Sequence, residues 1–148
     1  MFKKLIDTND DAVQTVLRLA LGIMIFPHGA QKMLGWFGGG GFSGTIQFFS
    51  GTFGVPAILA VLVIFAEFFG GLGLIAGFLS RVAAAGVALV MLGAVFMVHL
   101  QNGFFMNWMG NQAGEGFEFH LLAVALAVAV MVRGSGALSL DAMLSKKP

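Results

Sequence analysis

Four runs of apolar residues, separated by polar or glycine-rich stretches, organise the sequence. They cover residues 12–33, 55–79, 81–100 and 117–133. A helix needs about 20 mainly apolar residues to cross the hydrocarbon core of a bilayer, and the first three runs reach that length. The fourth run spans the bilayer if Glu118 and His120 lie at its interfacial end, or if the helix extends past Arg133. The pattern therefore predicts an all-α fold, an integral membrane four-helix bundle that forms a single domain over residues 1–148.

The composition agrees with this prediction. Of the 148 residues, 58% are hydrophobic and only 10% are charged, and a chain of this size cannot bury so much apolar surface against itself. The lipid bilayer is therefore the expected solvent. The net charge of +1 gives no electrostatic basis for binding nucleic acid. The absence of cysteine excludes disulfides, thiolate metal ligands and a thiol relay within the chain.

The basic residues that flank the four runs predict the orientation, because Lys and Arg collect in the cytoplasmic loops of membrane proteins. In a four-span arrangement, all of them except Lys32 fall on one side of the membrane. These residues are Lys3, Lys4, Arg81, Arg133, Lys146 and Lys147. We therefore predict a protein of the cell inner (cytoplasmic) membrane with both termini in the cytoplasm. The stretches 34–54 and 101–116 are then loops on the outer face.

Both outer loops are rich in aromatic residues and glycine. Trp36 and Phe37 begin the first loop, and the second contains Phe104, Phe105 and Trp108. Trp and Phe at the edge of a membrane are ordinary interfacial anchors. The alternative is that the loops fold over a ligand site as an apolar lid, and both interpretations stay open at this stage.

Ionisable residues within the runs are candidates for function, because a charged group inside a membrane is costly and usually faces the bundle interior. In the first run, Arg18, His28 and Lys32 fall in one sector of the helix. Glu67 lies near the middle of the second run and needs a cation or a proton. We predict a buried Arg18–Glu67 pair. It either fixes the helix register or acts catalytically, by relaying protons or polarising a ligand.

A second group of candidates lies near the predicted outer face. His28 and Lys32 end the first run, His99 ends the third, and Glu118 and His120 begin the fourth. We predict that these five residues bind a ligand. A metal or haem held by His28, His99 and His120 is one interpretation, a quinone or similar organic molecule is another, and a structural role is the third. No HExxH pattern favours a metal, and Glu118 and His120 point apart on a regular helix.

An ordered set of short motifs resembles the DoxX family of small four-helix bacterial membrane proteins. The motifs are residues 18–22 (RLALG), 26–32 (FPHGAQK), 66–71 (AEFFGG), 77–81 (GFLSR) and 134–141 (GSGALSLD), together with His99 and Glu118. The resemblance implies a compact four-helix bundle in the cytoplasmic membrane. The name of the family comes from a subunit of a thiosulfate:quinone oxidoreductase, and other relatives are linked to membrane-associated redox complexes. Because this chain has no cysteine, a thiol-based mechanism does not carry over.

Two functions follow as hypotheses. The first is an oxidoreductase subunit of a quinone-linked redox system. It would need a partner redox subunit or a bound cofactor as its electron source, because the sequence contains no flavin, haem-c or iron–sulfur motif. The second is a non-enzymatic membrane module that binds or passes a small molecule or scaffolds a complex, with or without a metal or haem. A homo-oligomer is compatible with either function.

Overall fold

The computed structural model describes residues 2–145, and all of the regular structure in this range is helical. The main helices are α1 (Phe2–Ile6), α2 (Ala12–Leu34), α3 (Gly41–Phe53), α4 (Ala57–Ala76), α5 (Ser80–Ala94), α6 (Glu118–Arg133) and α7 (Leu140–Ser145). A 3₁₀ turn, η1 (Trp36–Gly38), follows α2. The π-helical segment η2 (Val95–His99) and the 3₁₀ turn η3 (Leu100–Asn102) extend α5 without interruption. The all-α prediction is confirmed.

Three of the predicted spans are helices that are long and apolar enough to cross a membrane. They cover Ala12–Leu34, Ala57–Ala76 and Ser80–Asn102. Pro27 lies within the first of them and does not end the helix. The fourth predicted span coincides with α6, which has 16 residues and is therefore shorter than the usual length of about 20. That α6 crosses the membrane as the fourth helix of a bundle stays a prediction.

One of the two predicted outer loops contains a helix. Within the stretch 34–54, the residues Gly41–Phe53 form α3, which packs on both α2 and α4, so the prediction of a loop is wrong there. The helix ends at Gly54, whose φ of +64° is a left-handed conformation that favours glycine. The other predicted loop, 101–116, is irregular after η3. We call residues 103–117 the outer loop from here on.

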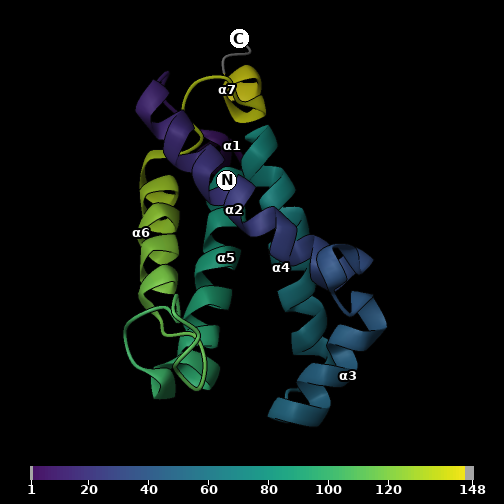
Figure 1. Ribbon diagram of the computed structural model, residues 1–148. Coiled ribbons are helices and arrows are strands. Elements are labelled where there is room, and N and C mark those ends of the chain that lie inside the picture. Colours follow the sequence, from purple (N-terminus) through teal and green to yellow (C-terminus); the bar gives the residue numbers. More distant parts are fainter. Residues whose placement is uncertain (1, 146–148) are drawn as a thin grey trace.

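The helices define two ends of the molecule (Figure 1). At the terminal end, α7 lies near the start of α2, the end of α4 and the start of α5. At the loop end are α3 and the outer loop. The basic residues Arg81 and Arg133 both lie at the terminal end, where Arg81 donates a hydrogen bond of 3.1 Å to the Asp7 carbonyl and Arg133 pairs with Asp11. Lys146 and Lys147 lie outside the described residues. That the terminal end faces the cytoplasm stays a prediction.

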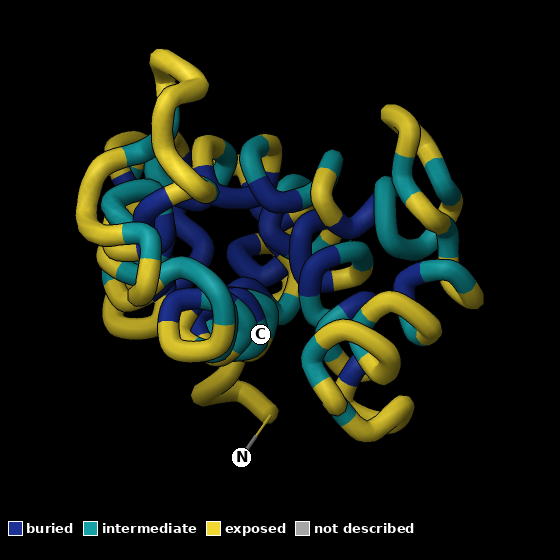
Figure 2. The backbone as a smooth tube through the Cα atoms, turned by 60° about the horizontal axis from the view of Figure 1, so that its bottom comes forward, coloured by how far each residue is buried: buried dark blue, intermediate teal, exposed yellow. Residues whose placement is uncertain are grey.

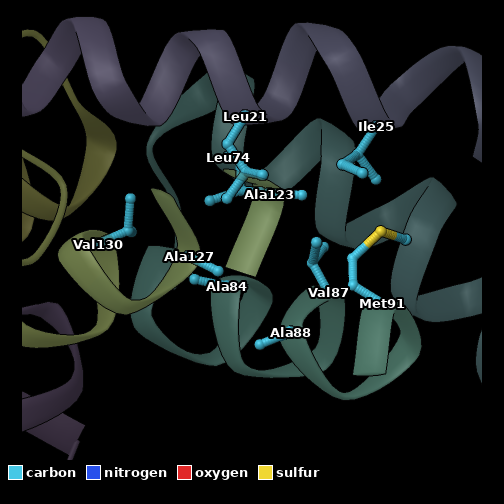
Figure 3. Packing of buried hydrophobic residues seen from close by; sticks show 10 residues of the cluster. All are labelled: Leu21, Ile25, Leu74, Ala84, Val87, Ala88, Met91, Ala123, Ala127 and Val130. Carbon is cyan, nitrogen blue, oxygen red and sulfur yellow. The ribbon is translucent and has the colours of Figure 1, made fainter. Parts of the chain in front are cut away.

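The apolar core lies where α2 crosses the other long helices (Figure 3). It contains Leu21 and Ile25 of α2, Leu74 of α4, Ala84, Val87, Ala88 and Met91 of α5, and Ala123, Ala127 and Val130 of α6. The alanines of α5 and α6 allow these two helices to approach closely, as small residues do in membrane bundles. Buried backbone is concentrated in the interior of the molecule, while the outward sides of the helices are exposed (Figure 2). The exposed sides are largely apolar and suit contact with lipid.

Glycines bring α2 and α4 into backbone contact. A Cβ atom added to Gly29 of α2 would lie 2.5 Å from Phe68 Cα and 2.6 Å from the Glu67 carbonyl carbon of α4. A Cβ atom on Gly71 of α4 would lie 2.8 Å from Phe26 Cα. These separations leave no room for a side chain, so the crossing of the two helices requires glycine at both positions.

We expect Gly29→Ala to destabilise the protein by about 1–3 kcal/mol, because the methyl group must push α2 away from α4. Gly93→Ala is the matched control. It changes a helical glycine whose added Cβ meets no atom within 4 Å, and it gains up to about 1 kcal/mol of helix propensity. Thermal unfolding in detergent should therefore show a lower midpoint for Gly29→Ala and an unchanged or higher one for Gly93→Ala. Equal midpoints for the two variants would contradict the close contact.

Candidate functional site

A buried ion pair joins the last turn of α2 to the middle of α4. Lys32 Nζ lies 2.6 Å from Glu67 Oε2, and the side chains are 23% and 4% exposed. Lys32 lies in the last turn of α2, and Gly29, one turn earlier, allows α2 to contact the backbone of α4 at Glu67. The close crossing of α2 and α4 thus brings the Lys32 ammonium group into contact with the Glu67 carboxylate. An ion pair satisfies a carboxylate that is buried at membrane depth.

The predicted Arg18–Glu67 pair is wrong. Arg18 is 1% exposed and directs its guanidinium toward the terminal end, where it donates hydrogen bonds to the carbonyls of Leu74 and Ile75. The last carbonyls of a helix have no partner within that helix, so Arg18 caps the end of α4. It also donates to Ser135 O at 2.8 Å and to Leu138 O at 3.2 Å. The guanidinium therefore serves backbone carbonyls, and Glu67 takes its cation from Lys32.

The three histidines lie at the loop end, and two of them are in contact. The ring centroids of His99 and His120 are 4.1 Å apart. Phe119 lies between His120 and His28, at centroid distances of 5.5 Å and 6.2 Å. His28 is exposed on the surface of α2 and is within electrostatic range of Lys32, Glu67 and His120. The histidines and the ion pair thus form one cluster of titratable groups, which we call the polar cluster.

The hydrogen bonds of the two stacked histidines differ. His99 Nδ1 lies 2.8 Å from the Glu115 carbonyl oxygen, and a carbonyl can only accept, so Nδ1 of His99 carries a proton. His120 is 7% exposed, and its buried Nδ1 has no hydrogen-bond partner within residues 2–145. A buried polar atom without a partner is unusual in a native structure. His120 Nδ1 therefore has a hydrogen-bonding capacity that no described residue uses.

Glu118 contacts the outer loop, and the arrangement of the histidines does not form a metal site. The Glu118 carboxylate accepts a hydrogen bond of 2.8 Å from Met106 N, so it faces the backbone of the outer loop and holds that loop in place. In the described part of the chain, no three side chains of His, Asp, Glu or Cys are arranged to hold a metal ion. The geometry therefore gives no support to a metal held by His28, His99 and His120.

Sequence reasoning missed a second buried polar region at the terminal end. Asp141 is 1% exposed and accepts from Leu79 N at 2.8 Å and Ser80 N at 3.1 Å, which caps the start of α5. It also accepts from the Ser135 hydroxyl. Asp141 ends the motif GSGALSLD, whose backbone carbonyls bind Arg18. Because Asp141 lies outside the apolar runs, the hydrophobic pattern does not indicate that its carboxylate is buried.

The sequence model of the DoxX family matches residues 13–100. The chain belongs to the DoxX family. As a DoxX protein with helices that are long and apolar enough to span a bilayer, it is a multi-pass protein of the inner membrane.

Two DoxX relatives are informative. The chain is 36% identical to "Inner membrane protein YqjF" of Escherichia coli (strain K12) over 141 residues, which is 93% of this chain and 96% of the relative. It is 33% identical to "Putative oxidoreductase CatD" of Bacillus subtilis (strain 168) over 131 residues, which is 88% of this chain and 86% of the relative. No solved structure shows a significant match.

Proposed function

We propose that this DoxX protein is a membrane subunit of a quinone-linked redox system and that the polar cluster binds the quinone headgroup. The proposal rests on a buried Lys32–Glu67 ion pair and on a buried His120 Nδ1 that has no hydrogen-bond partner within residues 2–145, with His28 and Phe119 linking the two. Binding sites for small molecules are mainly apolar with a few placed polar groups. The polar cluster, among Phe119 and the phenylalanines of α4, has this character.

The chemistry of a quinone suits these residues. Each carbonyl oxygen of a quinone accepts hydrogen bonds, which the Lys32 ammonium and a protonated His120 Nδ1 can donate. Reduction to the quinol consumes two electrons and two protons. The protons would pass through Lys32 and the imidazoles, with Glu67 holding the Lys32 side chain in position. The electrons would come from a partner redox protein, and the name of the Bacillus relative supports an oxidoreductase setting.

One member of the polar cluster, His28, is exposed, which suits a ligand that arrives from the membrane. His28 is exposed on α2, within a helix that can span the bilayer, and a quinone partitions into the hydrocarbon core. We assign Arg18 a structural role in this scheme, because its donors serve backbone carbonyls at the terminal end.

The test is an inventory of what copurifies with the protein in mild detergent. We expect quinone in the lipid extract of the wild type and little in that of the double variant Lys32→Met/Glu67→Gln, which removes both charges together. Lys4→Met is the matched control and should keep its quinone, since Lys4 lies in α1 at the terminal end. A wild type free of quinone, with no chromophore in its absorbance spectrum, would overturn the proposal and favour a non-enzymatic module.

A further inference from the structure

We infer that the outer loop, residues 103–117, inserts its tip into the interfacial layer of the bilayer. Phe105, Trp108 and Met109 in this loop are 68%, 84% and 86% exposed. They lie close together in the sequence, and exposed apolar patches of this kind usually mark a binding surface. This inference does not depend on the proposed quinone site.

The tip is a defined turn. The Asn107 side chain accepts from Gln112 N at 3.0 Å and donates to Gln112 O at 3.3 Å, so it closes the turn across its base. Gly110, with a φ of +68°, lies within the turn, and its N–H donates to Asn107 O at 3.1 Å. Trp108 and Met109 are thus held at the apex by bonds that leave their side chains outward.

The carboxylates at the end of the loop are hydrogen-bonded to its backbone. Residues 100–114 contain no charged side chain. The two carboxylates that follow accept hydrogen bonds from the backbone of the loop, Glu115 from Asn107 N at 2.6 Å and Glu118 from Met106 N at 2.8 Å. Trp108 and Met109 at the tip therefore have no charged side chain beside them in the sequence that would resist transfer from water into the interface.

The loop lies beside the last turns of α5 (Figure 1). His99 Nδ1 and Asn102 Nδ2 both bond to the Glu115 carbonyl, and Phe117 N donates to Gly103 O at 3.2 Å, so the two ends of the loop meet next to η2 and η3. The outward side of this segment is apolar, with Phe96, Met97 and Leu100 exposed. They belong to the span Ser80–Asn102.

This continuity identifies lipid as the occupant of the surface. The bilayer that covers the exposed side of η2 must end close to the outer loop, so the same interface can receive Trp108. Trp is enriched at the interfacial level because its ring is both apolar and able to donate a hydrogen bond. Since the loop also bonds to His99, its insertion would fix the depth at which the polar cluster lies below the membrane surface.

Single-tryptophan variants test the inference, because the chain has only two tryptophans. Trp36→Phe leaves Trp108 as the sole reporter, and Trp108→Phe leaves Trp36 as the matched control. Each variant is reconstituted in phosphatidylcholine vesicles that carry bromine either near the headgroup or near the chain ends. We expect Trp108 to be quenched several-fold more by bromine near the headgroup than by bromine at the chain ends, and to be protected from iodide in the water.

Two results would overturn the inference. Quenching of Trp108 by iodide but not by either brominated lipid would place the tip in water. Protection from iodide together with no quenching by brominated lipid would mean that a protein, such as a second copy of the chain, covers the tip. The emission of the Trp108→Phe control reports whether the vesicles and quenchers work in each preparation.

Discussion

Lys32→Met is expected to destabilise the protein by about 3–5 kcal/mol, because it leaves the Glu67 carboxylate buried without its cation. Glu67 is 3% exposed and lies in the middle of a helix that can span the bilayer. In the described part of the chain, no second cation forms an ion pair with Glu67 that could replace the 2.6 Å contact with Lys32. Chemical unfolding in detergent, followed by circular dichroism, measures the loss.

The double variant Lys32→Met/Glu67→Gln separates the cost of an unpaired charge from the cost of losing the pair. Removing both charges is often close to neutral for a buried pair, so we expect the double variant to recover most of the stability that Lys32→Met loses. Lys4→Met makes the same change in the exposed helix α1 and should cost less than about 0.5 kcal/mol. If the double variant is as unstable as the single one, the ion pair does not determine the stability at this site.

Arg18→Met is expected to have an effect of similar or larger size, on the order of 3–5 kcal/mol. Four backbone carbonyls, at Leu74, Ile75, Ser135 and Leu138, would lose their donor, and each buried acceptor left unpaired costs about 1–3 kcal/mol before the structure relaxes. The unfolding midpoint in detergent measures this change. Arg18→Lys should rescue little of it, because an ammonium cannot reproduce the planar fork of the guanidinium.

Arg81→Met is the matched control for Arg18→Met. Arg81 also donates to backbone carbonyls, those of Asp7 and Val132, but these bonds are exposed at the terminal end, where water can replace them. A loss of about 1 kcal/mol is expected. Below its unfolding temperature, Arg18→Met should still copurify with quinone, since Arg18 contacts the terminal end and not the polar cluster. Loss of quinone from a folded Arg18→Met protein would contradict the structural role of Arg18.

The helices were predictable because their signal is a long apolar run. Three of the predicted spans correspond to helices of the right length and composition, and the fourth corresponds to α6. α3 (Gly41–Phe53) was not predicted, because five glycines interrupt or border it and it has no charged residue to mark one face. Its helical state depends on packing against α2 and α4, which is tertiary information.

The partners of the charged residues were less predictable than their positions. Helical periodicity placed Arg18 and Lys32 on one side of α2, but it could not tell which of them lies at the level of Glu67. That level is decided by where α2 crosses α4, and the crossing depends on the backbone contact at Gly29. In the same way, nothing in the apolar pattern connects Asp141 to the start of α5, since the two are 61 or 62 residues apart in the sequence.

The measurement that tests the central proposal most directly is photolabelling with an azido-quinone, followed by peptide mapping. We predict that the label attaches to the end of α2 around His28 and to the start of α6 around His120, and that an excess of unmodified quinone prevents the labelling. The double variant Lys32→Met/Glu67→Gln should lose this labelling, while Lys4→Met keeps it. Labelling at the terminal end around Arg18 and Asp141, or labelling that unmodified quinone does not reduce, would contradict a quinone site in the polar cluster.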